Sequence, residues 1–154
     1  MINNLENMKL TTDEEEVISI SDEGREAEIE SCSLSLIEKL LTCRSFNKRA
    51  VQGTLKHAWG LENQVQVVEV GANLFQFKFN SEFDMNRVLK GGPWTFDNQV
   101  LLLVRWKSGM IAGNVKFESV SCWVQILGVP FDMVSPSVVE AVGGQIGVVK
   151  EVEK

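Results

Sequence analysis

The sequence lacks any apolar run near the roughly 20 residues that a membrane-spanning helix needs. Its N-terminal residues also lack the basic-then-apolar layout of a signal peptide. We therefore expect an intracellular protein with no membrane association, in either the nucleus or the cytoplasm. Cysteines are few, with only Cys32, Cys43 and Cys122. An odd, scattered set argues against a disulfide framework, so we expect reduced and mostly buried thiols.

Motifs that mark enzymes are missing as well. The single histidine, His57, has no neighbouring cysteine, serine or aspartate in a nucleophile–base pattern, and the glycine-rich phosphate-loop patterns are absent. We interpret the Gly91-Gly92-Pro93 run as a helix stop instead. The sequence predicts no catalytic residue, no metal site and no cofactor, and an enzyme is the least favoured class.

Charge is divided unevenly along the chain. Residues 1–30 carry ten acidic and two basic residues, a net charge of −8, whereas residues 31–154 carry 13 basic and 11 acidic residues, a net charge of +2. Because the first 31 residues are acidic and free of aromatics, we expect an acidic disordered leader over residues 1–32. One short β-favouring run, residues 16–21, is the exception, since it could add to a sheet edge.

The remaining residues, 33–154, predict a single α+β domain. Strands are expected at residues 36–42, 64–70, 73–79 and 98–106, with helices at 45–60 and 82–90. For residues 36–42 the pattern fits a helix as well as a strand. This βαββαβ order is typical of a ferredoxin-like sheet, the topology of RNA-recognition (RRM-like) domains, with a core at residues 34–107. A further βαβ extension at residues 118–154, with strands at 120–127 and 148–152 around a helix at 136–142, is expected to cover the second face of the sheet.

Local patterns fix the expected caps and faces. Ser45 and Ser81 are predicted to cap the two helices, and Gly60 to end the first. Alternation in the third strand directs Phe75, Phe77 and Phe79 to the helix-facing core. The apolar helix positions are Ala50, Val51, Thr54, Leu55 and Ala58 in the first helix and Phe83, Met85, Val88 and Leu89 in the second. The four tryptophans, Trp59, Trp94, Trp106 and Trp123, are predicted core or domain-junction residues.

Four stretches, residues 45–51, 74–79, 88–94 and 123–130, carry a family resemblance. The most specific are the Gly91-Gly92-Pro93-Trp94 run and the Trp123-Val124-x-Ile126-x-Gly128-x-Pro130 run. Residues 33–154 resemble the plant domain of unknown function found in first-reading-frame proteins of LINE-type retroelements, usually ahead of a CCHC zinc knuckle. The resemblance implies a retroelement-derived module associated with nucleic acid. The knuckle is absent here, and the chain ends about where the family's next strand begins, as expected of a fragment or a truncated gene copy.

The RNA-recognition comparison fails at the base-stacking positions. Placing Phe79 on the last aromatic of the K/R-G-F/Y-G/A-F-V-x-F/Y motif puts Leu74 and Gln76 where the stacking aromatics belong, and Ala72 on the basic position. Basic side chains offer another mode of binding, since phosphate contacts need no aromatic platform. One candidate cluster is Arg44, Lys48, Arg49 and Lys56, around the first helix. A second is Lys78, Arg105 and Lys107, at the sheet.

Two hypotheses about function follow from these observations. The first is a non-catalytic module that binds single-stranded RNA or DNA weakly, without sequence preference, through phosphate contacts. The alternative is a protein-interaction module that binds itself or another protein through exposed strand edges and has no nucleic-acid role. The salt dependence of RNA binding, measured beside the oligomeric state, distinguishes the two.

Overall fold

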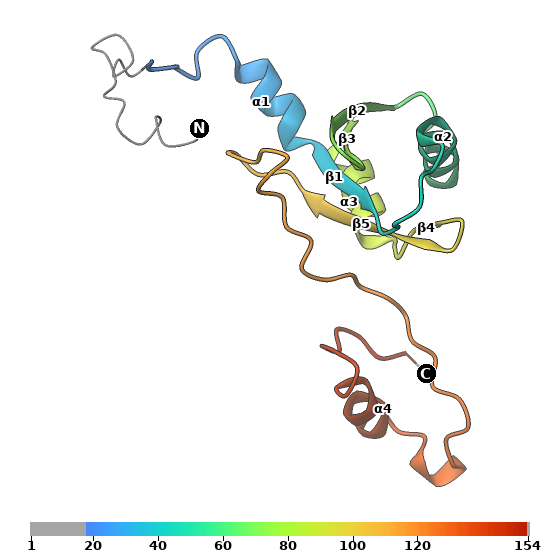
Figure 1. Ribbon diagram of the computed structural model, residues 1–154. Helices are drawn as coiled ribbons and strands as arrows, with labels where there is room; N and C mark the ends of the chain where they lie inside the picture. The colour runs from blue at the N-terminus through green and yellow to red at the C-terminus, as the bar shows by residue number, and fades with distance from the viewer. Residues whose placement is uncertain (1–17, 154) are drawn as a thin grey trace, which may run out of the picture.

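The computed structural model describes residues 18–153, and Figure 1 shows the arrangement of their helices and strands. In chain order the elements are α1 (Glu26–Ser33), β1 (Ser35–Leu40), α2 (Lys48–Trp59), β2 (Val65–Gly71), β3 (Leu74–Phe79), α3 (Glu82–Lys90), β4 (Thr95–Phe96), β5 (Gln99–Arg105), a short 3-10 helix η1 (Phe131–Met133) and α4 (Pro136–Gly143). The predicted α+β class is confirmed. None of the helices within residues 18–153 has the length and hydrophobicity needed to cross a bilayer.

The five strands form one antiparallel sheet in the order β2-β3-β1-β5-β4. Leu36 of β1 lies opposite Phe77 of β3 on one side and opposite Arg105 of β5 on the other. Since directly opposite residues in an antiparallel pair share a face, this register defines two faces of the sheet. The core face carries Leu36 and its partners, and the second face carries Ser35, Ile37 and theirs.

The core lies between the core face and helices α2 and α3. Phe75, Phe77 and Phe79 are all buried there, so the predicted register of β3 is confirmed. Trp59 at the end of α2 packs its ring edge-on to Phe77, with 5.1 Å between ring centroids. The Trp94 ring also lies edge-on to the Trp59 ring, with 6.1 Å between ring centroids. Large aromatic side chains bury the most area per residue and therefore dominate this core.

Helix α2 corrects two predictions. Its N-cap is Asn47, whose side chain accepts a hydrogen bond from the backbone N–H of Ala50, rather than Ser45. Its buried face is Val51, Leu55 and Trp59, while the predicted Ala50, Thr54 and Ala58 are exposed. The helix rotates toward the larger side chains because they remove more apolar area from water. Gly60 ends the helix with a left-handed φ of 67°, as predicted.

Helix α3 begins at Ser81, as predicted, because the Ser81 side chain accepts a hydrogen bond from the backbone N–H of Asp84. Met85 and Val88 are buried, as expected, but Phe83 is 76% exposed. Phe83 precedes Met85 by two positions, or about 200° around the helix, and so points away from the sheet. Its predicted core contact is wrong.

The part of the leader that the structure describes also differs from expectation. Helix α1 forms over Glu26–Ser33, where the sequence predicted disorder. Of the suggested edge strand, residues 16 and 17 lie outside the described residues, and residues 18–21 form no strand. Two glutamates in the first turn of α1, Glu26 and Glu28, stabilise the helix by interacting with the positive end of its dipole. None of its residues is buried, so its stability depends on the polar contacts described below.

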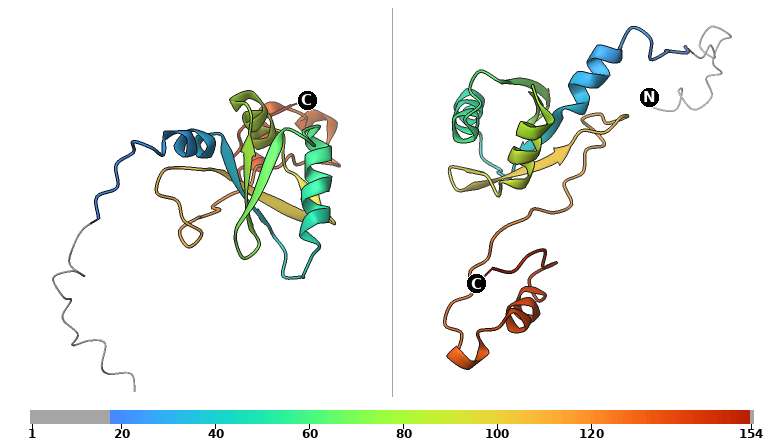
Figure 2. Two further views of the ribbon diagram at one scale, coloured as in Figure 1. Left: turned by 90° about the horizontal axis from the view of Figure 1, so that it is seen from above. Right: turned by 180° about the vertical axis from the view of Figure 1, so that it is seen from behind.

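Residues beyond β5 form only part of the predicted extension. Helix α4 forms where a helix was predicted at 136–142, with Pro136 in its first turn, and the Ser135 side chain caps it by accepting a hydrogen bond from the backbone N–H of Val138. The strands expected at 120–127 and 148–152 are absent among the described residues, and the segment lies apart from the sheet rather than over its second face (Figure 1; Figure 2, right). Trp123 is 60% exposed, contrary to its predicted core position. β-Favouring side chains form a strand only where a neighbouring strand completes the hydrogen bonds.

Candidate functional site

The first basic cluster gathers where the chain enters α2. Arg44, Lys48 and Arg49 are exposed there, and Lys56 is half-buried further along the helix. Lys48 forms an ion pair with Glu69 of β2, in which both side chains are about half exposed. Among the residues that the structure describes, Arg44 and Arg49 have no ion-pair partner. The structure therefore brings together three accessible cations in six residues.

The second predicted cluster is separated by the sheet. Lys78 lies opposite Ser35 on the second face, whereas Arg105 lies opposite Leu36 on the core face. Arg105 forms an ion pair with Glu82 at the start of α3, at 3.0 Å. Lys107 is exposed beyond the end of β5. Since Lys78 and Arg105 point to opposite sides, they do not form the single patch that the sequence suggested.

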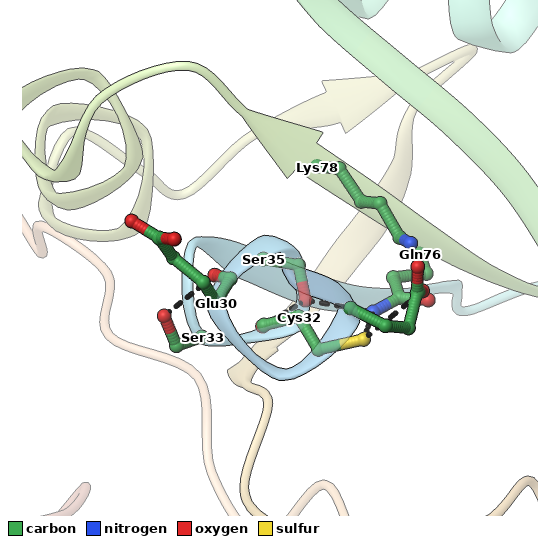
Figure 3. A network of polar contacts seen from close by, with 7 residues as sticks. Glu30, Cys32, Ser33, Ser35, Gln76 and Lys78 are labelled. Carbon is green, nitrogen blue, oxygen red and sulfur yellow. Dashed lines mark hydrogen bonds and ion pairs between the residues drawn. The ribbon is translucent and has the colours of Figure 1, made fainter. Parts of the chain in front are cut away.

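Lys78 instead belongs to a polar network beneath α1, shown in Figure 3. Its ammonium donates to the Glu28 carboxylate at 2.6 Å. The Gln76 amide donates to the Ser35 hydroxyl at 2.8 Å and approaches the Cys32 sulfur at 3.6 Å. The hydrogen bond from Lys78, and then its positive charge, hold the pKa of Glu28 below the usual value for a glutamate.

Sequence reasoning missed this network, because Glu28 and Lys78 are 50 residues apart. Glu28 and Cys32 are four residues apart, so they would share one face if the leader were predicted to be helical. That spacing was the only signal in the sequence. The spacing alone does not say which strand that helix meets. Only the register of β1 and β3 brings Ser35, Gln76 and Lys78 under α1.

The second face of the sheet carries no aromatic side chain on β1, β2, β3 or β5. Leu74 and Gln76, which the sequence comparison places at the base-stacking positions of RNA-recognition domains, are buried. A hollow of about 60 Å³ beside Arg44, lined also by Phe46 and Phe96, is far smaller than the roughly 300 Å³ of the smallest ordinary ligand pockets. Neither the second face of the sheet nor this hollow therefore offers a platform for stacking or enclosing a base.

Metal and nucleophile candidates remain scattered in the structure. Within residues 18–153 no three His, Cys, Asp or Glu side chains come together in a group that could hold a metal ion. Cys43 and Cys122 are exposed and Cys32 is half-buried, so the expectation of mostly buried thiols is wrong. The exposed His57 ring lies 2.7 Å from the Glu62 carboxylate, which is the next charged group along the chain.

One carboxyl group stands out by its burial. Glu38 of β1 points into the core between Leu36 and Leu40 and is 0% exposed. Both of its carboxyl oxygens lack a hydrogen-bond partner. Burial raises the pKa of Glu38 to about 8, because the hydrophobic surroundings disfavour the charged form. Strand alternation alone places Glu38 on the face of Leu36 and Leu40, so the sequence did contain a signal for it.

Comparison with known proteins gives one match. A family model described as "Domain of unknown function (DUF4283)" matches residues 28–113, which is more than half of the chain and includes most of α1 and the whole sheet. No curated protein and no solved structure matches the chain.

Proposed function

The chain belongs to the DUF4283 family, and from that premise we propose that it is a non-catalytic module that binds single-stranded RNA or DNA weakly and without sequence preference. The observation that carries the proposal is the exposed group of Arg44, Lys48 and Arg49 at the start of α2. Residues 34–107 contain ten Lys and Arg against six Asp and Glu, a net charge of +4. A basic surface of this kind attracts phosphates through charge, and such contacts do not distinguish bases.

Two finer parts of the proposal have separate support. A ferredoxin-like, RRM-like assignment is supported by the chain order β1-α2-β2-β3-α3-β5 together with the spatial order β2-β3-β1-β5. A retroelement origin in plants, in a protein that elsewhere carries a zinc knuckle, is supported by the Gly91-Gly92-Pro93-Trp94 run and the Trp123–Pro130 motif.

The test is a titration of labelled single-stranded RNA of several sequences, followed by fluorescence anisotropy over a range of salt concentrations. The variant Arg44→Ala/Lys48→Ala/Arg49→Ala should bind all sequences less tightly. Its log–log salt slope should be shallower by about 2, since each lost phosphate contact contributes about 0.7 on a single strand. A charge-matched control replaces Lys90, Lys116 and Lys150, which are exposed elsewhere. Equal effects from both triple variants, or no binding at low salt, would contradict the proposal.

The alternative of a self-association module also has a specific observation in its favour. Several large apolar side chains of the segment beyond β5 are exposed, with Leu127 at 77% and Phe131 fully exposed. Exposed apolar residues in such numbers are typical of surfaces that bind another protein. Analytical ultracentrifugation of the same samples tests this reading, because Leu127→Ser/Phe131→Ser should reduce any dimer and leave RNA binding unchanged.

A further inference from the structure

The contact between α1 and the sheet is polar and shallow. None of the α1 residues is buried, and Glu28 remains 68% exposed although it pairs with Lys78. Ion pairs with one solvent-exposed partner contribute little stability, commonly below about 1 kcal/mol. The helix is therefore held by few interactions, and among the described residues the Glu28–Lys78 pair is the one ion pair that joins it to the sheet.

Beneath α1 lies a polar surface rather than an apolar one. The Lys78 side chain is only 14% exposed, the Gln76 residue 8%, and Ser35 is fully buried. Ser35 is directly opposite Lys78 in the β1–β3 register, and Gln76 follows on the same face. The amide and the hydroxyl are already engaged, because Gln76 donates to Ser35 at 2.8 Å and Ser35 donates to the backbone carbonyl of Cys32 at 2.6 Å (Figure 3). The Lys78 ammonium is therefore the donor that an incoming anion could reach.

The Lys78 ammonium suits an anion with several acceptor oxygens. It offers three N–H donors, and Glu28 is the one charged acceptor paired with it. A phosphodiester carries the same single negative charge as the Glu28 carboxylate and has comparable oxygen acceptors. The carboxylate therefore occupies the position that a backbone phosphate would take.

We infer that α1 is an acidic cover that single-stranded nucleic acid displaces, with a backbone phosphate replacing Glu28 on Lys78. The inference rests on the proposed function and adds a second phosphate site, on the face of the sheet opposite to α2. Binding would then be self-limiting, because the attached helix competes at a high effective concentration. Only a chain with several phosphates, which also engages Arg44, Lys48 and Arg49, would displace it.

Glu28→Gln in the full chain tests the inference by removing the charge that pairs with Lys78. Binding of a labelled oligouridine should become about two- to fivefold tighter. Its salt slope should steepen by about 0.7, because the phosphate contact at Lys78 then forms without freeing a carboxylate that takes up a cation. Glu26→Gln is the matched control, because it removes the same charge from the same helix at an exposed position outside the Lys78 contact. Adding Lys78→Met to Glu28→Gln should abolish the gain.

Hydrogen exchange provides an independent readout. Saturating oligouridine should lower the protection of the α1 amides in the unsubstituted chain, whereas α2 and β3 should keep theirs. Equal affinities of the Glu28→Gln and Glu26→Gln chains, or unchanged α1 protection at saturation, would overturn the inference. If the Arg44→Ala/Lys48→Ala/Arg49→Ala chain still loses affinity in that case, the proposed function stands and only the cover is refuted. Absence of binding by every chain refutes both.

Discussion

Replacing Glu38 by leucine should stabilise this protein. The carboxyl group is fully buried, has no hydrogen-bond partner, and lies opposite Phe75 and Leu103 in the neighbouring strands. The buried core around it is hydrophobic, so no opposite charge offsets the cost of burial. Replacing an uncompensated buried ionisable group by a hydrophobic one of similar volume is expected to raise the free energy of unfolding by about 2–4 kcal/mol near neutral pH.

The pH dependence gives the sharper form of this prediction. Because the pKa of Glu38 is about 8 in the folded chain and 4.5 in the reference state, the folded chain holds the proton more tightly. The stability that Glu38 contributes by binding this proton is fully present below about pH 4.5 and is lost as the pH rises toward 8. At about 1.4 kcal/mol per pH unit, the natural chain should lose about 3 kcal/mol between about pH 5 and about pH 7 relative to Glu38→Gln, which cannot ionise.

Urea denaturation followed by tryptophan fluorescence, at several pH values, measures these differences. Glu69→Gln is the control, because Glu69 is on the same face in β2 but is half exposed and paired with Lys48. It should change the stability by less than about 1 kcal/mol, with no comparable pH dependence. Parallel pH profiles for the natural chain and Glu38→Gln, or a less stable Glu38→Leu, would refute the reasoning.

The fold supports two further predictions, both measurable in the same denaturation assay. Asn47→Ala should destabilise by about 1 kcal/mol because α2 loses its cap, while Ser45→Ala should cost less than about 0.5 kcal/mol; the reverse order would mean that α2 begins earlier. Phe77→Ala should cost about 3–5 kcal/mol because it removes a buried ring from the core. Gln76→Ala should cost only about 1 kcal/mol, the value of its hydrogen bond to Ser35, and equal effects at the two positions would contradict the register.

Local patterns were enough to predict much of the sheet and of its two covering helices. The alternation in β3 placed three phenylalanines correctly, and Ser81 and Gly60 marked their helix ends as expected. These features depend on residues within a few positions of one another, where backbone geometry determines which side chains share a face. The cap of α2 was misplaced by two residues, because Ser45 and Asn47 are both good capping residues and the local pattern does not select between them.

The sequence by itself determined the α+β class, the alternation of the strands and the division of charge between an acidic leader and a basic remainder. Tertiary structure alone decided that Lys78 and Arg105 lie on opposite faces, that Glu28 meets Lys78, and that residues 120–127 form no strand. Each of these depends on which strands become neighbours. Residues far apart in the chain come together only when the whole sheet is assembled, because strand pairing and not local conformation sets those distances.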